Sequence, residues 1–278
     1  MEHPFYKNTE EFRVDCKNCF GLCCVALYFS SSEGFPQNKE AGNPCKNLKE
    51  NFTCAVHKTL IAKGLKGCTA YDCFGAGQKL SQLTFKGISW RDLPDAALMF
   101  DSFLVMRQLQ EMLWYLTEAF NIQEDKSAKE EIKRLIEATE KLTLLDAEAL
   151  LGLNLEAHRE KVNPILKAAS EYVRAKAIKS VNLKNSERGK RFDYLGADLR
   201  KTKLIGADLR GTLLIAARLN GNTLNGADFI GSDMRDADIR DADLSRSIFL
   251  TQAQINSAKG NAHTKLPERI LRPSHWEK

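Results

Sequence analysis

The chain has 278 residues, of which 43% are hydrophobic and 28% are charged, and its formal net charge is +5. Disordered chains combine low hydrophobicity with high net charge, so this composition excludes wholesale disorder. The richest apolar stretch, residues 96–120, carries four charged side chains, whereas a membrane-spanning helix needs about 20 nearly uncharged residues. The start of the chain shows no basic segment followed by an apolar one. This predicts no secretory signal, no membrane span and a cytoplasmic protein.

The cysteines define the first region, which we expect to span residues 1–88. All eight fall between residues 16 and 73, and the glycines and prolines among them predict a loop-rich unit with little regular structure. In a reducing cytosol, clustered thiolates are more often metal ligands than disulfide partners. The spacing of Cys54 and His57 would bring a sulfur and an imidazole together. The predicted metal ligands are Cys16, Cys19, Cys23, Cys24, Cys45, Cys54, His57, Cys68 and Cys73.

The first four cysteines, Cys16, Cys19, Cys23 and Cys24, resemble the motif of the CxxCxxCC family of zinc- or iron-chelating proteins, with one extra residue before the last pair. The resemblance covers about residues 12–80 and implies zinc or iron, including iron–sulfur, but it implies no reaction. Along an extended backbone, adjacent Cys23 and Cys24 point in different directions, so they suit different ions or roles better than one tetrahedral shell. The residues leave open a closed zinc site, an iron centre, a disulfide scaffold and buried free thiols.

The second region, residues 89–185, is predicted to be helical. Pro94 suits a first helical turn, and the apolar residues that follow it recur at mostly helical spacing. A Lys- and Glu-rich run around Ile136 predicts another helix. Asp146 is a candidate N-cap for a short helix, and a last helix is expected after Pro164.

The third region, residues 186–278, contains a repeat of five residues. Eleven consecutive units start at Ala197, and each has a small first residue and a large third residue. Five steps along an α-helix advance a side chain by about 140°, so the large residues would scatter around the cylinder. In a continuous strand, every second large residue would face the opposite side. The backbone must therefore turn once per unit, which directs both residues inward and builds a solenoid of stacked coils.

This run resembles the pentapeptide-repeat family, whose motif is A(D/N)LXX, over roughly residues 194–255. The resemblance implies a right-handed quadrilateral β-helix with four units in each coil, in which Arg218 and Asn222 depart from the motif. The register fails at Gln254, and residues 266–276 are expected to cap the last coil. The predicted fold class is therefore multi-domain α+β, with a Cys-rich metal-binding unit, a helical middle region and a C-terminal pentapeptide-repeat β-helix.

Two classes of function fit these features. The first is a non-catalytic scaffold or binding protein that holds zinc or iron and presents its β-helix to an unknown protein partner. Some pentapeptide-repeat proteins imitate DNA with long acidic β-helices. Residues 186–278 instead hold 16 basic and 12 acidic side chains, a net charge of +4, and fewer than three coils would span only about 10–15 Å. Mimicry of DNA is therefore disfavoured.

The second class is a metal-dependent enzyme with an open or redox-active metal. Flagellin lysine methylases look similar in carrying the same cysteine pattern, although no catalytic residue is identified here. The overall layout also resembles bacterial pentapeptide-repeat proteins described as conferring resistance to oxetanocin A, a nucleoside analogue. That resemblance implies a link to resistance against a toxic small molecule.

Overall fold

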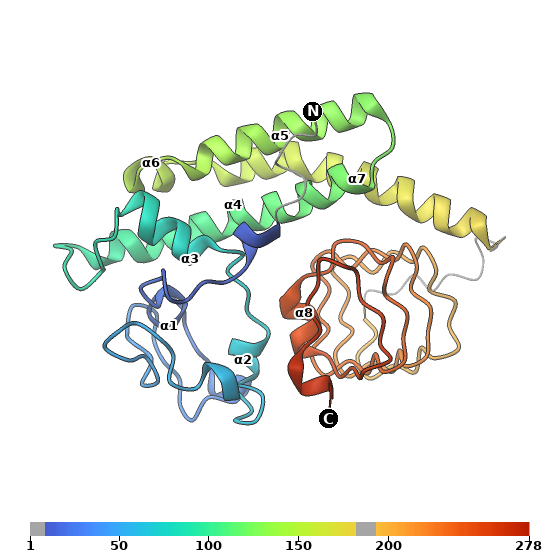
Figure 1. Cartoon of the computed structure of the whole chain (residues 1–278), viewed down its shortest axis with the longest axis horizontal. Coiled ribbons are helices and arrows are strands. Elements are labelled where there is room, and N and C mark those ends of the chain that lie inside the picture. The colour runs from blue at the N-terminus through green and yellow to red at the C-terminus, as the bar shows by residue number, and fades with distance from the viewer. Residues whose placement is uncertain (1–8, 182–192, 278) are drawn as a thin grey trace. The chain divides into compact units, whose positions relative to one another are not determined.

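The computed structural model describes residues 9–181 and 193–277. The chain divides into two compact units, residues 1–166 and 167–278, which are described separately (Figure 1). The boundary that the sequence predicts between residues 185 and 186 lies outside the described residues, as does the start of the chain, where the sequence shows no secretory signal. Among the described helices, none is both long and apolar enough to cross a membrane.

The first unit begins with a loop-rich segment that contains only short helices. They are η2 (Thr9–Phe12), α1 (Leu22–Ala26), η3 (Ser31–Glu33), η4 (His57–Thr59), α2 (Lys66–Thr69), α3 (Ala76–Lys79) and η5 (Leu80–Thr84). Isolated antiparallel bridges pair Phe29 with Lys39 and Leu48 with Cys54. Beneath these loops, two phenylalanines and a leucine form a small apolar core. We refer to Phe29, Phe35 and Leu65 as the loop core.

Helix α4 (Ala96–Ile122) is the centre of the first unit, and its residues 112–119 are all buried. It packs against α5 (Lys126–Thr143) and α6 (Ala147–Leu151) (Figure 1). The Asp95 carboxylate accepts a hydrogen bond from the Ala97 amide at 2.9 Å, which starts α4 at Ala96. Pro94 therefore precedes the helix, and its predicted place in the first turn is wrong. Asp146 does cap α6, as predicted, by accepting from the Ala149 amide at 2.8 Å.

Helix α7 (Leu155–Ser180) crosses the boundary between the two units. Its first turn is capped by the Asn154 side chain, which accepts from the Ala157 amide at 3.0 Å. Because this cap and the buried Val162 hold the early turns in place, the helix continues through Pro164 despite the missing amide hydrogen. The prediction that this helix begins after Pro164 is therefore wrong.

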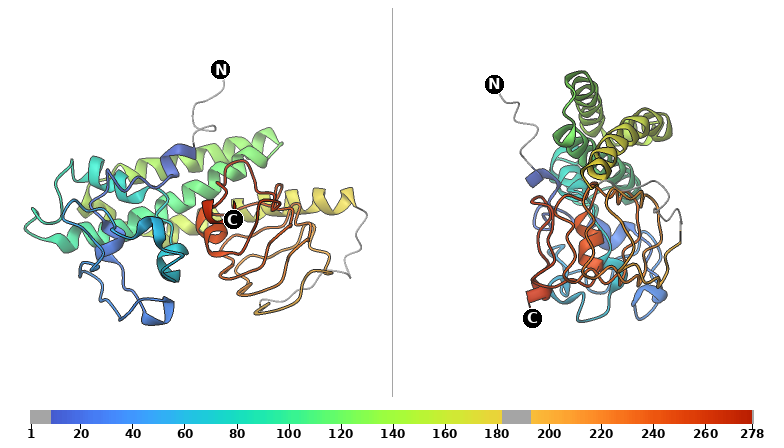
Figure 2. Two further views of the ribbon diagram at one scale, coloured as in Figure 1. Left: turned by 60° about the horizontal axis from the view of Figure 1, so that its bottom comes forward. Right: turned by 90° about the vertical axis from the view of Figure 1, so that its right-hand side faces the viewer.

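The second unit contains a stack of coils, each 20 residues long, which is four five-residue units (Figure 2). Backbone amides bond to the next coil, as in Leu209 N to Asp228 O at 3.0 Å. All eleven large residues of the repeat, from Leu199 to Phe249, are buried inside the coils. The inward direction that the five-residue period predicts is therefore confirmed.

The predicted C-terminal β-helix is nevertheless wrong, and so is the α+β fold class. Neither a β-strand nor a sheet occurs in the described residues, and their regular secondary structure is helical. A five-residue unit uses most of its residues to turn the corner, so a single residue on each side pairs with the next coil. Neighbouring coils are therefore joined by isolated parallel bridges, such as those of Arg218 with Asp198 and Asp238, rather than by continuous ladders.

Polar side chains complete the coils where the repeat departs from its motif. Asn222 replaces a small residue, and its Nδ2 donates to the Leu199 and Thr202 carbonyls of the neighbouring coil at 2.7 and 2.9 Å. After the repeat, Gln254 lies in α8 (Gln252–Ser257) and donates to the Phe229 carbonyl at 2.8 Å. The tail is held by bonds such as that from Arg269 to the Leu250 carbonyl, at 2.9 Å, and by the burial of Trp276.

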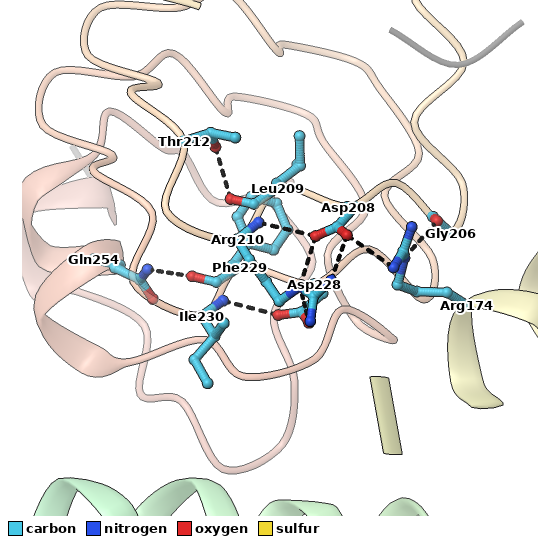
Figure 3. A network of polar contacts seen from close by, with 10 residues as sticks. All are labelled: Arg174, Gly206, Asp208, Leu209, Arg210, Thr212, Asp228, Phe229, Ile230 and Gln254. Atoms are coloured by element: carbon cyan, nitrogen blue, oxygen red, sulfur yellow. Dashed lines mark hydrogen bonds and ion pairs between the residues drawn. The ribbon is translucent and has the colours of Figure 1, made fainter. Parts of the chain in front are cut away.

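The C-terminal half of α7 packs along one side of the coils. Gly206 and Gly226 lie beneath it, and a Cβ atom at Gly226 would be only 2.5 Å from the Ala177 Cβ. Beside them, Arg174 donates to the Gly206 carbonyl and pairs with Asp208, both at 3.1 Å (Figure 3). Glycine at these corners is therefore what allows the helix to approach the coil backbone.

Asp228 lies on the same side, one coil after Asp208, and is fully buried. One of its oxygens accepts from the Ile230 amide at 2.9 Å (Figure 3). Its nearest cationic group is Arg210, whose Nε lies 3.5 Å away. Burial raises the pKa of this carboxyl to about 6, an effect that Ser170 and Arg210 only partly offset.

Candidate functional site

The turn that precedes α1 places two consecutive cysteines at the centre of the loop-rich segment. Gly21 caps this helix with φ of +66°, and a Cβ atom here would lie 2.5 Å from the Leu48 side chain, so glycine is required. Cys23 and Cys24 follow on the helix. Consecutive side chains of a helix point about 100° apart, so each of these two thiols also has neighbours that the other lacks.

Two further segments reach the same region through backbone contacts. The Cys45 amide donates to the Cys24 carbonyl at 2.9 Å. Cys45 and Cys68 both pack against the loop core. Cys54 is in the bridge with Leu48, whose amide bonds to the Cys45 carbonyl at 2.8 Å.

The segment around Cys73 joins the site from the side of α3 and α4. The Cys73 carbonyl accepts from the Ala76 amide at the start of α3, at 2.9 Å. In the same helix, a Cβ atom at Gly77 would lie 2.6 Å from the Cys19 Sγ, so the missing side chain lets Cys19 approach. Arg107 of α4 holds this segment by donating from Nε to the Asp72 carbonyl at 2.9 Å.

These segments form a partly open cavity of about 330 Å³, which is lined by seven of the eight cysteines and by His57. Cys45 is the cysteine outside this lining, and all eight thiols are free. The rest of the wall is mainly aromatic and aliphatic. It includes Val14, Leu27, Tyr28, Phe29, Phe35, Phe52, Leu60 and Tyr71. The sequence reasoning missed this wall, although aromatic residues interleaved with the cysteines are visible in the sequence.

Burial and mutual proximity raise the pKa values of the seven thiols that line the cavity. Hydrogen bonding of the Cys24 thiol to Cys23, and of the Cys54 thiol to Cys24, raises both their pKa values far above the usual range. Burial raises the pKa of Cys68 to about 12, and the nearby sulfurs of Cys45 and Cys54 contribute. Burial likewise raises the pKa of Cys73 to about 12. A bound cation would lower these pKa values, because it favours the thiolate over the thiol.

Cysteine sulfurs gathered around one cavity are suitable ligands for a thiophilic metal, but their side chains are not already arranged as a coordination shell. As the side chains lie, no three His, Cys, Asp or Glu residues in the described parts of the chain are grouped closely enough to hold one ion. Four sulfurs at about 2.3 Å from a zinc ion would lie only about 3.8 Å from one another. Binding would therefore have to draw the sulfurs inward from the cavity wall.

Comparison with known proteins identifies a family that matches the repeat and a relative that matches nearly the whole chain. The family described as Pentapeptide repeats matches residues 195–222 and 213–249, with eight copies of the repeat. The chain is also 52% identical over 268 residues to the uncharacterized protein YybG of Bacillus subtilis (strain 168), a match that covers 96% of this chain and 95% of YybG. No solved structure matches the chain.

Proposed function

This chain belongs to the family of the Bacillus subtilis protein YybG and carries pentapeptide repeats, and we propose that it is a non-catalytic, thiolate-based metal-binding protein of the reducing cytoplasm. The metal would be zinc or iron, held by the cysteines of the loop-rich segment. The observation that carries the proposal is the single cavity lined by seven free cysteines. Seven free thiols gathered around one cavity have no comparable use as packing residues.

The loop-rich segment also has a structural need for such an ion. Its own apolar core is small, comprising mainly Phe29, Phe35 and Leu65, and its helices have at most five residues. Segments with so small a core of their own are commonly stabilised by cross-links or metals. Metal would replace the thiol protons and join loops that are far apart in the sequence. The free energy of metal binding would therefore stabilise the folded segment.

The experiment is metal analysis of full-length protein purified without oxygen. We expect bound zinc or iron, and thiols that become reactive toward an alkylating agent only after a chelator is added. Cys54→Ser should lower the metal content, whereas His158→Gln should not, because His158 bonds Thr139 on α5 instead of lining the cavity. The proposal fails if the purified protein lacks both metals and its thiols react equally with and without added metal.

The cavity also supports a second candidate function, a metal-dependent enzyme. Its volume of about 330 Å³ exceeds what bare ions need. Tyr71 lines it, and among the described residues the buried hydroxyl of Tyr71 has no hydrogen-bond partner. Such a group can bind a small molecule beside a metal, which is also what a role in resistance to a toxic compound would require.

The enzyme candidate is tested with the cobalt-loaded protein and cyanide as the probe. An open coordination position predicts a change in the visible spectrum on cyanide addition, and Tyr71→Phe should alter that response. A spectrum that cyanide leaves unchanged would favour closed, non-catalytic centres.

A further inference from the structure

The consecutive cysteines of α1 separate the thiols around the cavity into two groups. The Cys23 and Cys24 thiols interact with each other, but their other cysteine neighbours differ, because successive helical side chains point about 100° apart. A tetrahedral ion needs its four sulfurs on one common centre. Two adjacent helical residues are therefore better placed to serve two centres than one.

The first group lies on the side of α3. Cys19 contacts this helix through Gly77, and Cys73 lies at its start, with its carbonyl bonded to the Ala76 amide at 2.9 Å. The Asp15 amide, next to Cys16, donates to Gln78 Oε1 of α3 at 3.3 Å, which brings Cys16 to the same side. The electrostatic interactions of Cys23 with Cys16, Cys19 and Cys73 agree with this grouping. The first group therefore contains four sulfurs from two separate segments of the chain.

The second group lies against the loop core. Cys45 and Cys68 both pack on this core, and the Cys45 amide bonds to the Cys24 carbonyl at 2.9 Å. Cys54 is bridged to Leu48, whose amide bonds to the Cys45 carbonyl at 2.8 Å. The electrostatic interactions of Cys54 with Cys24, and of Cys68 with Cys45 and Cys54, agree with this grouping. The second group also contains four sulfurs, drawn from four segments. The two groups meet where Cys23 adjoins Cys24, and Cys16 also interacts electrostatically with Cys54.

We propose that the chain holds two neighbouring metal centres, each with four cysteine ligands. The first comprises Cys16, Cys19, Cys23 and Cys73, and the second comprises Cys24, Cys45, Cys54 and Cys68. The inference rests on the proposed metal-binding function and adds the number of centres and their ligands. It also assigns His57 to the cavity wall, because each centre already has four sulfurs.

The test is anaerobic titration of the reduced, metal-free, full-length protein with Co²⁺, whose thiolate charge-transfer absorption reports each centre. We expect the absorption to saturate at two equivalents. The variant C16S/C73S should retain one equivalent, as should C45S/C68S, and H57Q should retain both. Combining C16S with C45S, and thus damaging both centres, should leave neither at full affinity.

A readout on the unmodified chain keeps the test independent of variants that fold poorly. Alkylation followed by peptide mass spectrometry at one equivalent of Co²⁺ should show the thiols of one group protected together before those of the other, or both groups protected in equal partial amounts. Saturation at one equivalent, or protection of thiols in sets that mix the two groups, would overturn the two-centre assignment while leaving metal binding intact. Failure of the unmodified chain to bind any Co²⁺ would instead refute the proposed function itself.

Discussion

The buried carboxyl of Asp228 predicts a stability that depends on pH. Its pKa is raised from an ordinary 3.8 to about 6, chiefly by burial under α7. Between those two pH values the folded state binds more protons than the unfolded state, so the free energy of unfolding falls as the pH rises from about 4 to 6. A shift of this size corresponds to about 3 kcal/mol.

The substitution Asp228→Asn should remove this decrease in the free energy of unfolding. Asparagine cannot ionise, but it keeps an oxygen that can accept the hydrogen bond from the Ile230 amide. Arg210 would lose a partner at 3.5 Å and would keep Asp208 at 2.5 Å. We therefore expect the variant to be more stable than the parent by up to about 3 kcal/mol at pH 8, and within about 1 kcal/mol of it at pH 4.

The assay is urea unfolding at several pH values, read by pulsed hydrogen exchange on peptides of the second unit. Asp238→Asn is the matched control, because Asp238 occupies the same position of the repeat. Hydrogen bonding from Arg240 lowers the pKa of Asp238, so its loss should destabilise the unit at neutral pH by less than about 1 kcal/mol, and less still at low pH. Identical pH profiles for Asp228→Asn and the parent would refute the burial argument.

Three further substitutions test the packing. Asn222→Ala should cost about 1–3 kcal/mol in urea unfolding, because the buried bond to the Leu199 carbonyl and the part-buried bond to the Thr202 carbonyl lose their donor. Gly226→Ala should make α7 more sensitive to limited proteolysis than Gly221→Ala, because both glycines have positive φ but only Gly226 lies against the helix. Equal sensitivity would show that backbone strain alone is responsible. Gly77→Ala should reduce the bound metal without unfolding the second unit, since its Cβ would displace Cys19; unchanged metal content would contradict the assigned position of that thiol.

The cysteine site shows how far donor types and spacings predict a centre. The residue types were readable from the chain. The different directions of Cys23 and Cys24 were predicted for an extended backbone, which is wrong, because both residues lie on helix α1, where successive side chains point about 100° apart. The grouping of the remaining thiols was not readable from the chain, because it depends on contacts between distant segments, such as the bond from the Cys45 amide to the Cys24 carbonyl and the approach of Cys19 to Gly77. The aromatic wall of the cavity was missed for the same reason.

In the first unit, some helix boundaries were predictable from the local sequence and others were not. The N-cap at Asp146 was predictable because a cap bonds to an amide only three residues away. The helix starts predicted at Pro94 and after Pro164 were wrong. The Asp95 cap starts α4 after Pro94, and the Asn154 cap together with burial along α7 starts α7 before Pro164.

The period of five residues by itself determined which side chains of the repeat face inward, because a turn in every unit leaves no other arrangement for Leu199 to Phe249. It did not determine how the coils pair, which the structure resolves as isolated bridges without strands. Nor did it distinguish Asp228, buried under α7, from Asp238 in the same position of the motif and paired with Arg240. Local periodicity depends on neighbours within a few residues, whereas burial depends on which distant segment covers a residue, and only the tertiary structure supplies that.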